Sequence, residues 1–173
     1  IKLTNKSSEK KSFTLFSYIE FCLWNAMDDM TNYQRNLNTG EVEVVDSTIY
    51  HKTEYRERRN HFAVYSVNAP VDGFDTSRDE FLGAYRGVTD PQVVEEGKSH
   101  NSITSGWYPI GSHQINVTLE PGETKSFIFV LGYCENPKDE KFVAPNVINK
   151  KPADVLLAKY QTDEQVDAAL AAL

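Results

Sequence analysis

The chain has 173 residues, of which 40% are hydrophobic and 12% aromatic, so it can bury the core of a single globular domain. Its formal net charge of −7 argues against a nucleic-acid partner, whose phosphates attract clustered Lys and Arg. No stretch approaches the ~18 consecutive apolar residues of a membrane span, and residues 1–6 lack the pattern of a signal peptide. We therefore expect a cytoplasmic protein that binds neither nucleic acid nor a membrane.

The first predicted strands are residues 1–4 and 13–24. Because the chain begins with Ile inside a strand, rather than with Met, we expect it to be a segment of a longer protein. Residues 13–24 are rich in β-branched and aromatic side chains on both alternating faces, which is typical of a strand buried on both sides. Residues 25–40 are polar and without a regular period, which predicts a long loop of the kind that often carries function.

Three further strands are predicted at residues 41–45, 49–55 and 61–67. The first two are separated by Asp46 and Ser47, which suit the corner of a hairpin.

A short helix is predicted next, because Thr76 and Asp79 form a capping-box pattern and Gly83 can adopt the left-handed conformation that ends a helix. Its inward-facing side chains are expected to be Phe81 and Leu82.

Residues 115–119 and 127–131 predict a hairpin around the turn at 120–123. Pro121 and Gly122 suit the two central positions of a type II turn, since Pro fixes φ and Gly accepts the positive φ that follows. The strict alternation of apolar residues in the first strand indicates one solvent-facing side.

Residues 135–151 are charged and contain prolines, which predicts a connecting segment. Two helices are predicted after it. Pro152 suits the first turn of one helix, and Thr162 with Gln165 forms a capping-box pattern for the other. The chain ends on the apolar face of this second helix, so we expect more protein to follow.

Cys22 and Cys134 each lie in an apolar run, which favours reduced, buried thiols over a disulfide or a metal site. The four histidines are scattered without zinc-type spacing. We expect no metal and no cofactor.

Several segments resemble, in order, the N-terminal region of the cellobiose phosphorylases, which are inverting disaccharide phosphorylases. They cover nearly the whole chain and are residues 16–24, 32–36, 50–61, 73–76, 81–83, 106–107, 111–113, 131–133 and 148–150.

The resemblance implies a large antiparallel β-sandwich, a helical linker and an (α/α)-barrel that carries the general acid and the phosphate-binding residues. We therefore expect a mainly β chain, an incomplete supersandwich-like antiparallel β-sandwich with short C-terminal helices. The sandwich portion would be residues 1–134, the connecting segment 135–151, and the linker helices 152–173. Catalytic residues are expected only in the barrel of the same protein, outside this chain.

The reaction implied for the parent protein is the phosphorolysis of cellobiose to α-glucose 1-phosphate and glucose with inversion, with inorganic phosphate as co-substrate. The resemblance also implies a homodimer. The alternatives are a relative acting on cellodextrins, laminaribiose or chitobiose, and a stand-alone carbohydrate-binding or dimerisation module.

The best candidate site lies in the loop, at Tyr33, Gln34 and Arg35. An amide beside a guanidinium can hold vicinal hydroxyls, and a tyrosine ring can line the apolar face of a sugar. By resemblance, Gln34 and Arg35 reach the acceptor-sugar subsite. The alternative is that Arg35 only pairs with Asp28 or Asp29 and fixes the loop.

Other candidates are better explained structurally. The basic residues in 55–59 have acidic neighbours, which favours ion pairing over phosphate binding. The aromatic pair in 105–109 favours a buried cluster over sugar stacking. Asp72, Asp75 and Asp79 lack calcium-loop spacing, and helix capping would explain them.

Overall fold

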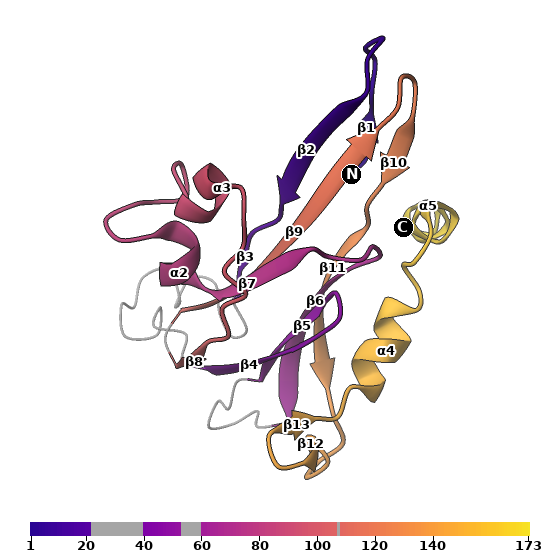
Figure 1. The fold of residues 1–173 in the computed structure, drawn as a ribbon. Helices are drawn as coiled ribbons and strands as arrows, with labels where there is room; N and C mark the ends of the chain where they lie inside the picture. The colour runs from indigo at the N-terminus through magenta and orange to yellow at the C-terminus, as the bar shows by residue number, and fades with distance from the viewer. Residues whose placement is uncertain (22–39, 53–59, 107) are drawn as a thin grey trace.

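The computed structural model describes residues 1–21, 40–52, 60–106 and 108–173 and shows a mainly β fold with short helices (Figure 1). The strands are β1 (Lys2–Thr4), β2 (Lys11–Phe16), β3 (Ile19–Glu20), β4 (Gly40–Val45), β5 (Thr48–Lys52), β6 (His61–Val67), β7 (Gly73–Ser77), β8 (Ser105–Gly106), β9 (Pro109–Leu119), β10 (Thr124–Ser126), β11 (Phe129–Glu135), β12 (Phe142–Ala144) and β13 (Val147–Ile148). The helices are α2 (Arg78–Leu82), α3 (Gln92–Glu96), α4 (Lys151–Leu157) and α5 (Asp163–Ala171). Among these helices, none is long and apolar enough to cross a bilayer.

The strands form two larger sheets and two small ones, and the pairings are antiparallel. One larger sheet has the order β11-β6-β5-β4-β8, and the other is built around β9, which pairs with β2, β3 and β7. The small sheets are β1–β10 and β12–β13. In Figure 1, α2 and α3 lie on one side of this strand framework and α4 and α5 on the other.

The two larger sheets share an apolar core. The ring of Tyr65 in β6 lies 4.8 Å from the ring of His113 in β9, centre to centre. Gly111 of β9 permits this approach, because a Cβ there would come within 2.7 Å of Tyr65 Cδ1. Ile49 and Ala63 are buried beside Tyr65 on the same face. The expected antiparallel β-sandwich is therefore confirmed.

The opposite face of the five-stranded sheet is covered by α4 and the β12–β13 hairpin. Tyr50, Phe62 and Val64 of the sheet pack there against Ile148 and Leu157. Burying side chains of this size contributes about 1.5–3 kcal/mol each relative to exposure.

Helix α2 begins one residue later than the sequence pattern predicted. Ser77 is the N-cap, and its side chain accepts a hydrogen bond from the Glu80 amide. Thr76 is instead buried, and its hydroxyl donates to the Ser102 carbonyl 2.9 Å away. The inward residues Phe81 and Leu82 are confirmed, each 2% exposed.

The predicted single strand at 13–24 is wrong in its described part. Two shorter strands, β2 and β3, flank residues 17–18, and Phe13 is 41% exposed. Among the described strands, β2 pairs only with β9 and so lies at an edge of its sheet. An edge strand can leave apolar side chains in solvent, which the run of hydrophobic residues did not reveal.

The predicted hairpin of 115–119 with 127–131 is also wrong. The turn is present, since the Glu123 amide donates to the Glu120 carbonyl and Gly122 has φ of 78°. However, β9 pairs with β2, whereas β10 pairs with β1 and β11 with β6. The alternation in 115–119 is confirmed, because Ile115, Val117 and Leu119 are buried.

The C-terminal helices match the sequence signals. Helix α4 has Pro152 in its first turn. Helix α5 has the complete capping box, in which Thr162 accepts from the Gln165 amide and Gln165 accepts from the Thr162 amide. The segment 135–151 contains the β12–β13 hairpin, which composition alone did not indicate.

Candidate functional site

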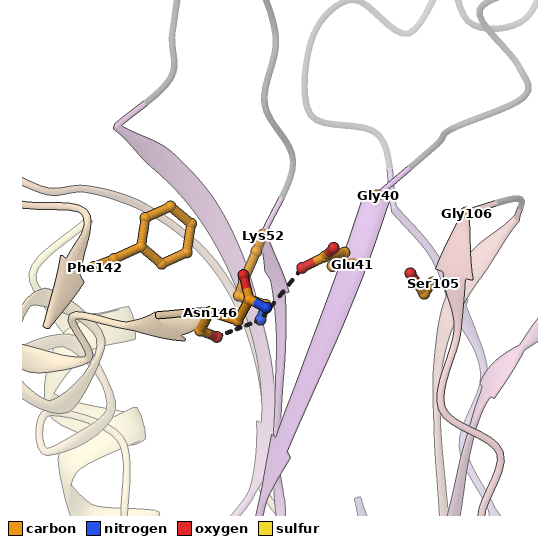
Figure 2. Close-up of a pocket in the computed structure, with 7 residues that line it drawn as sticks. All are labelled: Gly40, Glu41, Lys52, Ser105, Gly106, Phe142 and Asn146. Atoms are coloured by element: carbon orange, nitrogen blue, oxygen red, sulfur yellow. Dashed lines mark hydrogen bonds and ion pairs between the residues drawn. The ribbon is translucent and has the colours of Figure 1, made fainter. Parts of the chain in front are cut away.

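A pocket of about 540 Å3 opens where strands of the five-stranded sheet end (Figure 2). It is formed by the beginning of β4, the end of β5, β8 and the β12–β13 hairpin. Its lining residues are Gly40, Glu41, Lys52, Ser105, Gly106, Phe142 and Asn146.

Strand pairing brings opposite charges together in this pocket. Glu41 of β4 is the direct partner of Lys52 in β5, so both side chains project from the same face of the sheet. The side chain of Lys52 is 6% exposed, and its Nζ lies 3.8 Å from Glu41 Oε2. Nζ also donates a hydrogen bond to the Asn146 carbonyl, 2.6 Å away. The ammonium group is therefore held in place at the base of the pocket.

The β12–β13 hairpin supplies the opposite wall. Asn146 has φ of 60°, a left-handed conformation that Asn tolerates in turns. The Phe142 side chain is 40% exposed, and Lys141 Nζ lies 5.5 Å from the centre of its ring. The hairpin is fixed to the sheet because Lys150 pairs with Glu43. The aromatic ring and the charged pair thus face one pocket from different sheets, as Figure 2 shows.

This arrangement suits binding better than acid–base chemistry. The Lys52 and Glu41 charges offset one another, and Ser105 adds a hydroxyl. Within the described ranges, no group of three or more His, Cys, Asp or Glu side chains could hold a metal ion.

A buried histidine supports the start of β4 from the other face of the sheet. The ring of His51 is fully buried and stacks on Phe21 at 4.9 Å between centres. Burial lowers the His51 pKa to about 3, so the ring is neutral. A Cβ at Gly40 would lie 2.7 Å from His51 Nε2, so a larger residue there would clash with the ring.

The predicted sugar-binding residues Tyr33, Gln34 and Arg35 lie outside the described residues, as do Asp28 and Asp29. Gly40, at the pocket, is the first described residue after that segment.

The predicted basic segment 55–59 falls entirely in the undescribed range 53–59, and Trp107 is not described either. Tyr108 is described, and the Arg78 guanidinium carbon lies 5.7 Å from the centre of its ring. The prediction that the aromatic pair in 105–109 belongs to a buried cluster, rather than stacking on a sugar, therefore stays a prediction.

Helix capping does not explain Asp72 and Asp75. Asp75 is fully buried and accepts hydrogen bonds from the His100 amide and from both the amide and the hydroxyl of Ser102. Asp72 accepts from the Asn116 amide. Asp75 thus connects β7 to the loop that precedes β8, and Asp72 connects the residues before β7 to β9.

The expected buried, reduced thiol is confirmed for Cys134, which is free and 6% exposed. Burial raises the pKa of this thiol. Cys22 lies outside the described residues.

Sequence reasoning missed the pocket because its walls are remote in the chain. Lys52 and Asn146 are 94 residues apart. A strand was predicted at residues 41–45, but nothing local in the sequence indicated that Phe142 lies opposite it.

The chain is similar over all or nearly all of its length to parts of longer proteins. An N,N'-diacetylchitobiose phosphorylase of Vibrio furnissii is 28% identical over 179 residues, covering 100% of this chain and 20% of the relative. The enzyme of the same name from Vibrio proteolyticus is 29% identical over 177 residues, with the same coverage. A solabiose phosphorylase of Paenibacillus borealis is 24% identical over 173 residues, covering 96% of this chain and 22% of the relative.

The chain thus spans about a fifth of the length of these curated relatives. The family model described as "Glycosyl hydrolase 94, supersandwich domain" matches residues 1–163, which include both larger sheets, the pocket and α4. The chain therefore belongs to the glycosyl hydrolase 94 family and comprises supersandwich-domain sequence.

Proposed function

We propose that this chain is the non-catalytic sandwich domain of an inverting disaccharide phosphorylase and that it shapes the acceptor-sugar site. The observation that carries the proposal is the supersandwich match over residues 1–163. Relatives that match over 96–100% of the chain and are named as phosphorylases support it.

The proposed substrate of the parent protein is cellobiose. The ordered segments resembling cellobiose phosphorylases, such as 32–36 and 50–61, support this choice. N,N'-diacetylchitobiose is the second candidate, because two relatives named for it match the entire chain. In either case, a phosphate oxygen attacks the anomeric carbon, the glycosidic C–O bond breaks, and an acid protonates the leaving oxygen. We assign that acid and the phosphate-binding groups to a barrel outside this chain.

Within the chain, Tyr33, Gln34 and Arg35 are the proposed acceptor contacts. Residues 1–134 would form the sandwich portion, 135–151 the connection and 152–173 the linker helices that lead to the barrel. We further propose that the parent protein is a cytoplasmic homodimer whose co-substrate is inorganic phosphate and which needs no other cofactor.

The test uses the full-length parent protein and measures phosphate-dependent release of sugar 1-phosphate from cellobiose and from N,N'-diacetylchitobiose. Cellobiose should be the faster substrate. Arg35→Ala should raise the KM for the glucose acceptor in the synthetic direction by about tenfold or more, the effect of losing ~1.4 kcal/mol of binding, while the KM for phosphate stays unchanged. Arg86→Ala is the matched control, because Arg86 pairs with Asp90 and Glu95 beside α3.

If N,N'-diacetylchitobiose is turned over faster, it is the substrate in place of cellobiose, and the assignment as a phosphorylase stands. Absence of phosphorolysis with both sugars would refute the proposed activity. Equal effects of the Arg35 and Arg86 variants would remove the assigned role of Arg35.

A further inference from the structure

Lys52 retains hydrogen-bonding capacity inside the pocket. An ammonium group can donate three hydrogen bonds, and leaving a buried charge incompletely hydrogen-bonded is costly. Among the described residues, Nζ donates one hydrogen bond, to the Asn146 carbonyl. The Glu41 carboxylate at 3.8 Å is close enough for an ion pair but too far for a hydrogen bond. An oxygen acceptor on a ligand would complete the coordination of this ammonium group.

Glu41 provides the complementary acceptor. Its side chain is 52% exposed, so its carboxylate can meet a ligand at the mouth of the pocket. An anionic ligand attracted by Lys52 would be repelled by Glu41. A cationic ligand attracted by Glu41 would be repelled by Lys52. A neutral molecule with hydroxyl groups can satisfy both, because each hydroxyl donates and accepts.

The remaining lining residues fit one class of neutral polyhydroxyl ligand. The exposed ring of Phe142 offers a flat apolar surface, which suits the C–H face of a pyranose. The pocket volume of about 540 Å3 lies in the range of small-molecule sites, roughly 300–1,000 Å3. Ser105 also lines a second hollow, of about 510 Å3.

We propose that this pocket is a carbohydrate-binding site that holds a neutral pyranose between Lys52, Glu41 and the ring of Phe142. The described residues of the site belong to strand ends and to the β12–β13 hairpin. It concerns binding alone and does not depend on the parent protein being a phosphorylase.

A fluorescent reporter at the pocket wall tests this proposal in the full-length parent protein. Phe142→Trp places an indole where the sugar would pack, and cellobiose is titrated without phosphate so that phosphorolysis cannot proceed. Val143→Trp is the matched control, because Val143 is the adjacent residue of β12, is 65% exposed and is not among the residues that line the pocket. A saturable emission change is expected for Phe142→Trp, beyond the change in the unmodified protein or the Val143→Trp protein.

Two further substitutions in the Phe142→Trp protein test the charged pair. Lys52→Met should weaken the apparent affinity for cellobiose by about tenfold or more, the equivalent of one charged hydrogen bond. Glu41→Gln alters a half-exposed side chain and should leave the fold intact. It should tighten the binding of glucuronate relative to glucose, because the repulsion of anions is removed.

The proposal is overturned if Phe142→Trp and Val143→Trp respond alike to cellobiose, or if Glu41→Gln leaves the preference between glucuronate and glucose unchanged. Thermal melting of each variant checks that it is folded. If Lys52→Met lowers the melting temperature, the proposal is judged on the Glu41→Gln result. None of these readouts measures phosphorolysis, so failure here is distinguishable from failure of the proposed enzymatic function.

Discussion

Gly132 of β11 lies against Leu156 of α4 so closely that a Cβ at position 132 would overlap Leu156 Cδ2 and come 3.0 Å from Val64 Cγ1. Gly132→Ala should therefore force Leu156 away from the sheet and destabilise the docking of α4 by about 1–3 kcal/mol. Hydrogen-exchange mass spectrometry of the parent protein would measure this as faster exchange in residues 151–157.

The matched control is Gly87→Ala, because no atom lies within 4 Å of a Cβ built at Gly87. Adding Leu156→Ala to Gly132→Ala should restore part of the protection by relieving the overlap. Equal exchange in the Gly132 and Gly87 variants would contradict the proposed contact.

The stability of the sandwich should decrease in mild acid because of two buried histidines. Burial lowers the pKa of His51 to about 3 and of His113 to about 4, from an ordinary value of 6.5. Below pH ~6.5 the unfolded chain binds protons that the folded chain excludes. The contribution of these two histidines to the free energy of unfolding is therefore fully present above pH ~6.5. It falls as the pH decreases towards ~4, by up to ~1.4 kcal/mol per pH unit for each histidine.

Denaturant titrations read by hydrogen exchange at about pH 7 and about pH 5 would measure this loss in peptides of β5 and β9. His51→Leu should remove roughly half of the difference between the two pH values. An unchanged difference in that variant would show that His51 is not the titrating group.

Asp75 should be more important for stability than its neighbour Asp72. Asp75→Ala leaves the Ser102 amide and hydroxyl and the His100 amide without their buried acceptor. The expected cost is at least ~1.5–3 kcal/mol, with faster amide exchange in residues 98–104. Asp72→Ala removes one exposed hydrogen bond and should cost less than about 1 kcal/mol. A larger effect at Asp72 would contradict this account.

The thiol of Cys134 should be unreactive in the folded protein. Its burial and raised pKa both reduce the concentration of accessible thiolate. Timed iodoacetamide labelling with peptide mapping should show slow modification of Cys134 under native conditions and rapid modification in denaturant. Equal rates in the two conditions would mean that the strand opens readily.

Local sequence signals predicted elements better than they predicted pairings. Strand β6 matches residues 61–67 as predicted, because a dense β-branched and aromatic run is bounded by turn residues. The capping box of α5 was also readable, since Thr162 and Gln165 interact within one helical turn. The turn at 120–123 was found as well, but its flanking strands pair with β2, β1 and β6, which depends on packing between remote segments.

The candidate sites also differ in whether they depend on local sequence or on contacts between remote segments. The Tyr33–Gln34–Arg35 site rests on residue chemistry and resemblance, and it stays a prediction. The pocket could not be predicted, because the Lys52–Asn146 contact joins strand β5 to the turn between β12 and β13, and the two segments share no sequence pattern. The role of Asp75 was misjudged because its partners, His100 and Ser102, are about 25 residues away in sequence.

The pairing of β2 with β9 has a consequence for the order of assembly during synthesis. Lys11 is opposite Leu119 and Lys2 is opposite Ser126, so the described partners of these two residues are made more than a hundred residues after them. The β4–β5–β6 meander, in contrast, is complete in sequence by Val67. Because closing long loops precedes any gain from remote contacts, folding should be slow. On the ribosome, the meander can form early, whereas the pairings of β1 with β10 and of β2 with β9 can form only late, and until then both strands are exposed to misassociation.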